Sequence, residues 1–514
     1  MPCGGGFDVR PWLKLTPGLD WRLGVAPKLQ HFSPYTALHE HASRKPDADA
    51  IVTEDATVTY GEFAERVVVS ASWLLHQGLI QGEVTGICIR GEIEHLVCAM
   101  ALLCLDTPHM SLGSHENAAT KRALARKVSV TQLVVEKPDD WMGDLRTIVA
   151  APRDPKTVFT APRATASSVF RGHTLDSIAV YQNTSGSTSV PKTFGFTIGR
   201  LLFLAGRYAK DPKERRTLRT GSIEFDAHRL NRIGSLLAGN TCIFLRDLSL
   251  QRLAAVCERA RVSIIHLGAY KLASLVHAER HTSARLPPYT GIMSGGSRVP
   301  GRLRQAVKAL LTDQLWVHYA TSEAGTISLA SPDQHEAYPE GVGFLEAGVT
   351  VEIVGPDGEG LDPGEIGQIR VFKPTMASGY LAEPGASSSF RDGWFYPRDL
   401  VSRATDEPLI FHGRADDVMI LNGINIFPSA IEDTLESHPD VQEAVAFSVK
   451  SRIHGEIPVA AIVLSANAQN CDTSHLLDHC RRSLGVRGPR QIRVVESIPR
   501  NQAGKPLRRE LASF

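Results

Sequence analysis

The sequence predicts an α/β fold with a large N-terminal domain of parallel, helix-covered sheets, which includes a small barrel-like subdomain, and a small mobile α+β C-terminal domain. Helical patterns alternate with short apolar runs through the first four hundred residues, which is typical of parallel sheets. From Val342 to Val401, short β-like segments are separated by Gly and Pro, as in antiparallel structure. The last hundred residues carry helix and strand patterns of their own. At 514 residues the chain is too long for one core.

Hydrophobic periodicity places the individual elements. Apolar side chains at helical spacing predict helices, and short apolar runs predict buried strands. The expected helices are 60–78, 96–105, 250–259, 302–311 and 476–484. The expected strands are 86–89, 132–136, 178–180, 241–245, 262–267, 315–319, 444–449 and 459–464. We place the boundary between an N-terminal domain, 1–415, and a C-terminal domain, 416–514, at Asp416.

Composition limits the class of partner. The formal net charge is +1 and 22% of the residues are charged, which disfavours a basic nucleic-acid surface. The longest apolar run, 96–105, is about half of a membrane span, and the N-terminus lacks a signal-peptide pattern. Eight scattered cysteines without a C-x-x-C pair indicate reduced thiols. We expect a cytoplasmic monomer or homodimer that binds no nucleic acid or membrane and whose partner is a small molecule or a protein.

A loop rich in hydroxyl groups follows the expected strand 178–180. Its sequence, YQNTSGSTSVPKT (181–193), fits the G-x-x-x-x-G-K-[ST] phosphate loop from Gly186 onward, except that Pro191 replaces the second Gly. Proline has no N–H to donate to a phosphate, so the backbone nest of that loop cannot form unchanged. The sequence therefore predicts a phosphate-binding loop of another design.

Five segments, in this order, resemble the core motifs of the adenylate-forming superfamily, which comprises acyl- and aryl-CoA synthetases, peptide-synthetase adenylation domains and luciferases. They are YQNTSGSTSVPKT (181–193), YATSEAG (319–325), GWFYPRDL (393–400), GRADDVMILNGINIFPSAIE (413–432) and PRNQAGKPLRREL (499–511). Weaker similarity over 46–63 extends the resemblance to nearly the whole chain. The resemblance implies a standalone acid ligase that uses ATP and Mg²⁺ to form acyl-AMP and pyrophosphate. The acyl group then passes to a thiol of CoA or to the phosphopantetheine of a separate acyl carrier protein.

The resemblance also implies which residues bind the nucleotide. Lys192 and the hydroxyl-rich loop would hold the β- and γ-phosphates, Tyr319 would lie against adenine, and Asp399, supported by Arg414, would accept from the ribose hydroxyls. The expected nucleotide-binding residues are Thr184, Ser185, Gly186, Ser187, Thr188, Lys192, Gly295, Gly296, Ser297, Tyr319, Ala320, Thr321, Ser322, Asp399, Arg414 and Lys505.

Four of the matched residues would be catalytic. Ser322 would donate to the α-phosphate, Glu323 would ligate Mg²⁺, and Lys192 would neutralise the leaving phosphates. Lys505 would bridge the substrate carboxylate and the α-phosphate. The resemblance further places a hinge at Asp416, about which the C-terminal domain (the lid) would rotate to withdraw Lys505 and bring Gly423 beside a thiol channel.

Some positions depart from the family pattern. Ser189 stands where the loop usually has Gly, and Ala320 and Ser322 replace Gly and Thr. Pro397 and Arg398 replace the usual Thr-Gly before Asp399, which questions the geometry of that turn. Ile420 occupies a position often held by Lys. No departure removes a group that the chemistry requires.

The acid is assigned from the stretch FDAHRLN (225–231), and the expected pocket residues are Phe225, Asp226, His228, Gly295 and His318. By resemblance to peptide synthetases, Asp226 would bind the ammonium group of an amino acid. Alternatively, His228 and Asp226 form a polar end for a hydroxybenzoate-like ring, or both point away from the pocket. Because ILNGINIFPSAIE resembles standalone ligases, we favour an aryl acid, such as a hydroxybenzoate starter unit of secondary metabolism.

Two other classes stay open at this point. A non-catalytic nucleotide-binding regulator would be expected to lack Lys505 or Glu323, and both residues are present. A phosphate-loop kinase or ATPase is disfavoured by Pro191.

Overall fold

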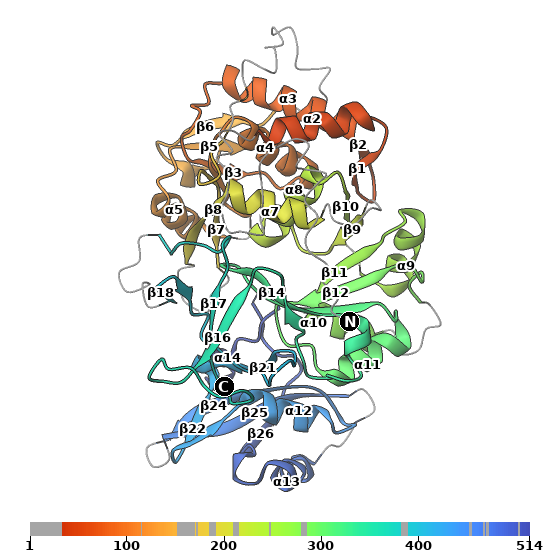
Figure 1. Ribbon diagram of the computed structural model, residues 1–514, viewed down its shortest axis with the longest axis vertical. Coiled ribbons are helices and arrows are strands. Elements are labelled where there is room, and N and C mark those ends of the chain that lie inside the picture. Colours follow the sequence, from red (N-terminus) through yellow and green to blue (C-terminus); the bar gives the residue numbers. More distant parts are fainter. Residues whose placement is uncertain are drawn as a thin grey trace.

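The computed structural model describes most of the chain. The described residues are 33–114, 116–151, 170, 173–184, 192–208, 215–245, 248–278, 285–381, 389–451, 455–465, 468, 472–501 and 504–513. The molecule is elongated, with two helix-covered sheets at one end, an antiparallel sheet in the middle and the C-terminal elements at the other end (Figure 1).

The largest sheet has nine strands in the order β15-β14-β13-β12-β11-β9-β10-β1-β2. Its central strands are parallel, and β2, β14 and β15 join it antiparallel. The carboxyl ends of β9, β11, β12 and β13 therefore lie along one edge, where ligands of such sheets bind. The strands are β1 (Asp49–Val52), β2 (Thr57–Thr59), β9 (Arg216–Arg219), β10 (Thr241–Phe244), β11 (Ile264–Gly268), β12 (Gly291–Gly295), β13 (Leu315–Thr321), β14 (Gly325–Ala330) and β15 (Phe344–Leu345).

The second sheet has six strands in the order β6-β5-β3-β4-β7-β8, parallel except for the antiparallel pair β7-β8. That pair carries the hydroxyl-rich loop at its turn. The strands are β3 (Thr85–Cys88), β4 (His109–Ser111), β5 (Gln132–Val135), β6 (Arg146–Val149), β7 (Ile178–Asn183) and β8 (Thr193–Thr197).

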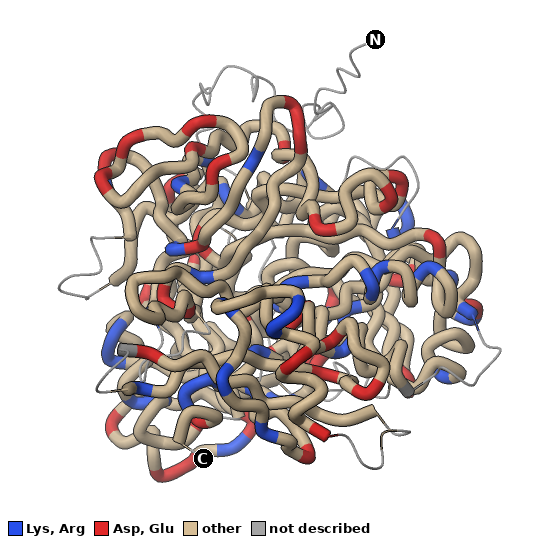
Figure 2. Tube along the Cα trace, turned by 90° about the horizontal axis from the view of Figure 1, so that it is seen from below, with Lys and Arg blue, Asp and Glu red and all other residues tan. Residues whose placement is uncertain are grey.

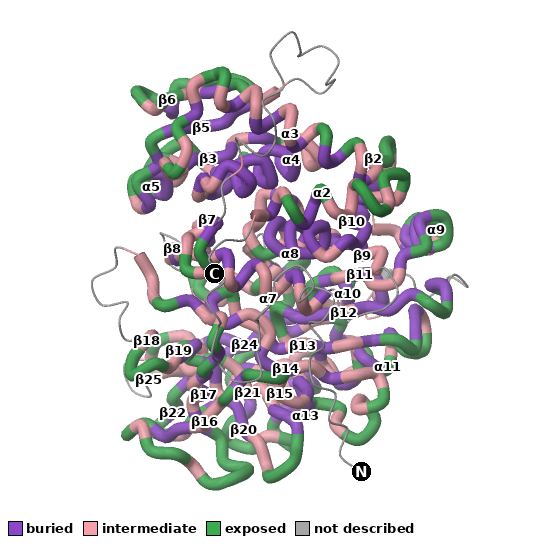
Figure 3. The backbone as a smooth tube through the Cα atoms, turned by 45° about the horizontal axis from the view of Figure 1, so that its top comes forward, coloured by how far each residue is buried: buried purple, intermediate pink, exposed green. Residues whose placement is uncertain are grey.

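Helices between these two sheets form the main core. α4 (Glu92–Cys104) is buried along nearly its whole length, whereas the loops at the rim are exposed (Figure 3). α3 (Tyr60–His76) begins at a capping box in which Thr59 and Glu62 satisfy each other's backbone N–H groups. The remaining helices of this part are α2 (Pro34–Arg44), α5 (Ala118–Lys127), α7 (Ile198–Tyr208), α8 (Asp226–Leu237), α9 (Leu250–Arg259), α10 (Ala269–Ala278) and α11 (Gly301–Leu310).

An antiparallel sheet follows, as the Gly- and Pro-rich texture of 342–401 predicts. Its order is β18-β19-β17-β20-β21, and β16 pairs with β17. Its core includes Ile369, Val371 and Phe395 and extends to Tyr319 of the large sheet. The strands are β16 (Thr350–Val354), β17 (Gly367–Phe372), β18 (Phe390–Arg391), β19 (Trp394–Phe395), β20 (Asp399–Ser402) and β21 (Ile410–Arg414).

The C-terminal elements have a core of their own, in which α12 and α13 pack on a sheet of order β23-β22-β25-β24, with β26 beside β25. β21 ends at Arg414 and β22 begins at Met419, so the proposed boundary at Asp416 falls between two sheets. The elements are β22 (Met419–Leu421), β23 (Ile424–Ile426), α12 (Pro428–Glu436), β24 (Val441–Ser451), β25 (Gly455–Leu464), α13 (Thr473–Leu484), β26 (Gln491–Val494) and α14 (Arg508–Ala512).

The predicted fold class is confirmed, and the differences lie at element ends. The helix expected over 96–105 begins earlier, at Glu92, because Gly91 provides an extended N-cap and the polar first turn carries no apolar signal. The strand expected over 178–180 continues to Asn183, because antiparallel pairing with β8 extends it through polar residues. Within the described residues, no helix is long and apolar enough to cross a membrane.

Gly343 fixes how β15 joins the edge of the large sheet. Its φ is +93°, and a Cβ there would lie inside the backbone of Leu329 and Ala330 in β14. Gly348 also has a positive φ, +79°, but a Cβ there would meet nothing within 4 Å. The two glycines therefore separate backbone strain from steric collision.

We expect Gly348→Ala to lower the free energy of unfolding by about 1 to 2 kcal/mol, the cost of a left-handed non-glycine residue. Gly343→Ala should lower it by clearly more, because the collision with β14 is added to the strain. Urea unfolding of both variants measures the difference. Equal destabilisation by the two substitutions would contradict the steric argument.

Candidate active site

Two hydrogen bonds join the two ends of the hydroxyl-rich loop where it connects β7 to β8. The Thr184 N–H donates to the Lys192 carbonyl at 2.8 Å, and the Thr193 hydroxyl donates to Asn183 Oδ1 at 2.8 Å. Lys192 is thus held at the point where the loop rejoins β8. The predicted ligands Ser185, Gly186, Ser187 and Thr188 lie outside the described residues, as do Ser189 and Pro191.

Tyr380 links the two groups expected at the phosphates and the metal. Its hydroxyl donates to Glu323 Oε1 at 2.5 Å, and Lys192 Nζ lies 4.8 Å from the centre of its ring. Glu323 is buried, with 7% of its surface exposed. A carboxylate held in this way presents hard oxygen to a magnesium ion, so the residue fits the predicted role.

Arg200 supports the turn that carries Ser322. Its guanidinium donates to the Ser322 carbonyl at 2.6 Å and lies 4.5 Å from the ring centre of Phe196. Burial lowers the pKa of Arg200 to about 10, although nearby Glu323 acts in the opposite direction. The Ala324 N–H donates to Thr321 Oγ1 at 3.0 Å and closes the same turn. The backbone around Ser322 is therefore fixed from two sides.

The predicted ribose ligand Asp399 is held by two other predicted residues. The Tyr319 hydroxyl donates to Asp399 Oδ2 at 2.6 Å, and Arg414 Nη1 donates to Oδ1 at 3.3 Å. Burial raises the pKa of Asp399, and Tyr319, Arg414 and Lys505 oppose that rise. Because Tyr319 orients this carboxylate, it has a positioning contact that the sequence motif did not reveal.

Arg398 preserves the turn before Asp399 without a glycine. Its φ is +65°, a left-handed conformation that costs a non-glycine residue about 1 kcal/mol or more. Its side chain reaches the predicted hinge residue, since Arg398 Nη2 lies 3.1 Å from Asp416 Oδ1. Arg414 Nη2 lies 3.5 Å from the other carboxylate oxygen. Asp416 is therefore held between two arginines.

Lys505 is seated at the large sheet, although it belongs to the C-terminal elements. Asn501 fixes its loop, accepting from the Lys505 N–H at 3.0 Å, and a Cβ on Gly504 would lie 3.2 Å from Tyr270 Cβ at the start of α10. Burial and then Arg414 lower the pKa of Lys505, whereas the carboxylates of Asp399 and Glu323 raise it. The ammonium group is therefore within electrostatic reach of Glu323, between β13 and β14, and of Asp399, the first residue of β20.

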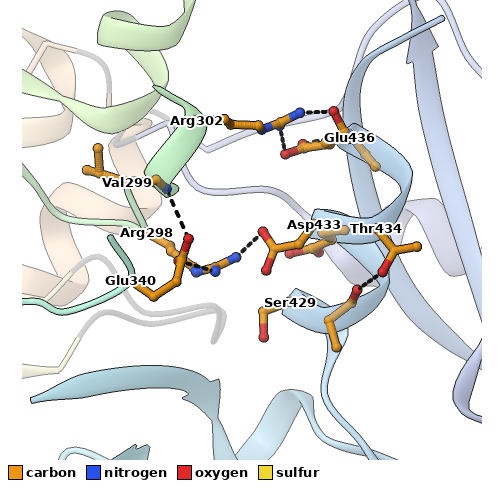
Figure 4. A network of polar contacts seen from close by, with 12 residues as sticks. Arg298, Val299, Arg302, Glu340, Ser429, Asp433, Thr434 and Glu436 are labelled. Carbon is orange, nitrogen blue, oxygen red and sulfur yellow. Dashed lines mark hydrogen bonds and ion pairs between the residues drawn. The ribbon is translucent and has the colours of Figure 1, made fainter. Parts of the chain in front are cut away.

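Ion pairs across the interface hold the C-terminal elements in this orientation. Figure 4 shows Arg298, before α11, between Glu340 and Asp433, and Arg302 of α11 against Glu436. Arg298 Nη2 lies 2.5 Å from Glu340 Oε2. A rotation of the lid would have to break the pairs that Asp433 and Glu436 make.

Gly423, the residue expected at the thiol channel, lies at the exposed turn between β22 and β23. Asn422 and Gly423 have φ values of +50° and +82°, and a Cβ on Gly423 would meet nothing within 4 Å. The role of Gly423 stays a prediction, which requires the rotated orientation. Elsewhere, basic and acidic residues are interspersed along the chain (Figure 2).

The expected acid-pocket residues fall into two groups. Asp226 accepts from the Asn183 N–H at 2.7 Å and pairs with the fully buried Arg229 at 2.5 Å, so it ties α8 to the end of β7. Phe225 is the N-cap residue of α8. His228 instead packs on Gly221, and burial followed by Arg232 and Arg219 lowers its pKa to about 3.

The second group lies at the ends of β12 and β13, where a Cβ on Gly295 would lie 2.7 Å from His318 Nε2. Gly296, at φ +85°, turns the chain away toward Ser297. Arg219 of β9 and His266 of β11, which the sequence did not single out, lie on neighbouring strands of the same sheet. They hydrogen-bond at 3.1 Å.

Comparison with known proteins identifies the family of the chain. A family model described as AMP-binding enzyme matches residues 38–381, and one described as AMP-binding enzyme C-terminal domain matches residues 430–505. The chain belongs to the AMP-binding enzyme family. It is an adenylate-forming enzyme, and the predicted superfamily is confirmed.

Individual relatives agree with this placement. A 2-succinylbenzoate–CoA ligase of Geobacillus kaustophilus is 27% identical over 491 residues, covering 92% of this chain and 96% of the relative. The solved structure of MenE, the O-succinylbenzoate coenzyme A synthetase of Bacillus subtilis, in complex with ATP and magnesium ion, has a TM-score of 0.81. It is 23% identical and covers 92% of this chain and 98% of its own. The anthranilate CoA ligase AuaEII in complex with anthranoyl-AMP has a TM-score of 0.82 at 18% identity, covering 94% and 97%.

We expect Lys505→Ala to slow adenylate formation by about 10² to 10³-fold, because the variant loses the cation that approaches the reacting anions. Pyrophosphate exchange into ATP measures this half-reaction. Lys450→Ala, which removes an exposed lysine of β24, serves as the matched control. Exchange at the parental rate in Lys505→Ala would remove Lys505 from the adenylation step.

Glu436 should make stability depend on pH. Its pKa is raised from 4.5 to about 7, chiefly by burial, although Arg302 and the Ala444 N–H act against the rise. Because the pKa of Glu436 is higher in the folded protein, folding favours its protonated carboxyl group. The stabilisation that results is greatest below pH 4.5 and is lost as the pH rises through 7.

We therefore expect the Tm of Glu436→Gln to rise relative to that of the parent protein between pH 5 and 8. Differential scanning calorimetry at several pH values measures the trend. Glu407→Gln, at an exposed carboxylate, is the control. Parallel pH profiles for the parent protein and Glu436→Gln would contradict the linkage.

Proposed function

We propose that this protein is an AMP-forming acid–thiol ligase, which adenylates a carboxylic acid with ATP and Mg²⁺ and passes the acyl group to the thiol of CoA. The observation that carries the proposal is the position of Lys505. Its loop, part of the C-terminal elements, packs against Tyr270 of the N-terminal part, and the carboxylates of Asp399 and Glu323 are near enough to raise the pKa of Lys505. A nucleotide-binding regulator has no need of a lysine brought there by a second domain.

The chemistry explains why cations converge there. The substrate carboxylate attacks the α-phosphorus of ATP, a C–O–P bond forms, and the bond to pyrophosphate breaks. Both reactants are anions, so stabilisation of negative charge carries most of the catalysis. Lys505 neutralises the meeting groups, Lys192 neutralises the leaving pyrophosphate, and Ser322 donates to the α-phosphate. Mg²⁺, held by Glu323, would supply additional positive charge at the phosphates.

The second half-reaction needs a different arrangement of the same domains. Attack by a thiol on the acyl-adenylate releases AMP and requires that Lys505 leave the site. Asp416, which is paired with Arg398 and Arg414, is the proposed hinge, and Gly423 the proposed thiol-channel residue. A separate acyl carrier protein is a second possible acceptor, because its phosphopantetheine presents the same thiol chemistry.

We further propose an aryl acid as the substrate class. The carboxylate of Asp226 is already neutralised by the buried Arg229, so an incoming ammonium group would compete with an internal ion pair. This observation weighs against the amino-acid alternative. The aromatic acids in the names of the 2-succinylbenzoate–CoA and anthranilate CoA ligase relatives support an aryl substrate.

Pyrophosphate exchange with aryl, aliphatic and amino acids tests the proposal. We expect exchange with aryl acids and formation of AMP, and with CoA present we expect an acyl-CoA product. Release of ADP, or no exchange with any acid, would overturn the ligase proposal. Exchange confined to amino acids would restore the alternative in which Asp226 binds an amine.

The variant Asp226→Asn tests whether Asp226 binds the amine of an amino-acid substrate. Because the substitution leaves Arg229 buried without its carboxylate, we expect a lower Tm and an unchanged ranking of acids. Selective loss of amino-acid activation in this variant would instead identify Asp226 as the residue that binds the amine.

A further inference from the structure

Three polar side chains project from one face of the large sheet at its carboxyl edge. Arg219, the last residue of β9, lies directly opposite His266 of β11. Gly268, two residues beyond His266 and so on the same face, lies opposite Gly295 of β12. Ser294 lies opposite Val317, so Gly295 is level with His318 of β13. Arg219, His266 and His318 therefore share a face, with two glycines between them.

Gly268 leaves space among these side chains, whereas the His318 ring covers Gly295. A Cβ on Gly268 would meet no atom within 4 Å, so the floor between Arg219 and His318 is open. Tyr270, two residues beyond Gly268, contacts the loop that carries Lys505, since a Cβ on Gly504 would lie 3.2 Å from it. The open floor is therefore next to the loop that brings the proposed catalytic lysine.

Arg219 is a buried cation that has no carboxylate partner among the described residues. It is 6% exposed and donates to the Tyr208 hydroxyl at 2.8 Å and to His266 Nε2 at 3.1 Å. Its more distant contact is Asn231 Oδ1 at 3.5 Å, and its buried Nε makes no hydrogen bond within the described part of the chain. A buried charge is costly unless it is paired, so the site lacks an anion.

Neighbouring arginines show the contrast. Arg229 pairs with Asp226 at 2.5 Å, and Arg207 pairs with Glu346 at 2.5 Å. Each of these two cations thus has a carboxylate of its own. Arg232, also buried, donates to the Arg219 and Gly221 carbonyls and likewise has no carboxylate partner among the described residues. Arg219 differs from Arg232 in its position, because it lies on the sheet face that also carries His266.

The surrounding histidines add donors and acceptors without adding charge. Burial and nearby cations, Arg219 among them, lower the pKa of His228 to about 3 and of His318 to about 4. The same causes lower the pKa of His266 well below its ordinary value. The Nδ1 atoms of His228 and His318 are buried and make no hydrogen bond with described residues. Neutral rings with unused nitrogens suit a polar ligand group next to the guanidinium.

We propose that Arg219, with His228, His266 and His318, binds a second anionic oxygen group on the acid substrate, a carboxylate or a phenolate remote from the carboxylate that is adenylated. The inference rests on the proposed function and narrows its substrate class to acids with two acidic groups. Arg219 is then a specificity-determining residue. A charge-assisted hydrogen bond to the guanidinium would favour such acids by about ten- to a hundredfold over the parent monoacid.

Pyrophosphate exchange with matched pairs of acids tests this on the unmodified protein. Benzoate is compared with terephthalate and with 4-hydroxybenzoate, and hexanoate with adipate. We expect at least one acid with a second acidic group to have a higher kcat/KM than the monoacid it is paired with. Whether terephthalate or 4-hydroxybenzoate is the better substrate shows whether the site prefers a carboxylate or a phenolate. If no such acid exceeds its parent, or none is activated, this inference is overturned. Exchange with benzoate or hexanoate alone would leave the ligase proposal standing.

Arg219→Met tests the residue itself. We expect KM for the preferred acid to rise by about ten- to a hundredfold, clearly more than KM for the parent monoacid, because only the preferred acid loses its charge-assisted hydrogen bond. Lys271→Met is the matched control, because it removes a nearby exposed cation that donates to the Thr220 carbonyl at 2.9 Å and makes no ion pair with the described residues. An equal loss for both acids of a pair, or the same shift in Lys271→Met, would refute direct recognition by Arg219. If Arg219→Met does not fold, the ranking of acids by the parent protein still decides.

Discussion

The arrangement depends on one electrostatic constraint: a lysine of the C-terminal elements must reach carboxylates of the N-terminal part across a domain boundary. The carboxylates of Asp399 and Glu323 raise the pKa of Lys505, and the ion pairs of Arg298 and Arg302 with α12 join the two parts in this orientation. The supporting contacts follow from this need. The Tyr319 hydroxyl donates to Asp399 and the Tyr380 hydroxyl donates to Glu323, so each tyrosine fixes the orientation of one carboxylate of the proposed active site.

Much of the fold could be predicted from periodicity because the large sheets are parallel and buried. Apolar runs of four to six residues predict buried strands, and the amphipathic stretches between them predict helices. The predicted and observed bounds of α9 and β10 agree within a residue. Strand ends made of polar residues were harder to predict. β7 runs on through Tyr181 to Asn183 because β8 pairs with it, and pairing across a loop leaves no local signal.

The site was predictable where a motif is continuous in sequence. The structure pairs Arg414 with Asp399, and both residues are near enough to Lys505 to shift its pKa. Arg200, Tyr380 and Arg219 were missed because each acts through contacts with residues far away in the chain. Arg200, for example, supports a carbonyl 122 positions later. An arginine within an apolar helix or strand is the available signal, since a buried charge calls for a partner. The sequence could not show that Asp226 already has such a partner in Arg229.

Arg398 combines two properties that are usually separate. Its backbone takes the left-handed conformation that glycine adopts without strain, and its side chain holds one carboxylate oxygen of Asp416, the proposed hinge residue. A change to glycine at this position would relax the turn and free Asp416 on one side in the same step. The positive φ of residue 398 and one ion pair of Asp416 thus depend on the same residue, and relief of the backbone strain by glycine would leave Arg414 as the arginine that holds this carboxylate.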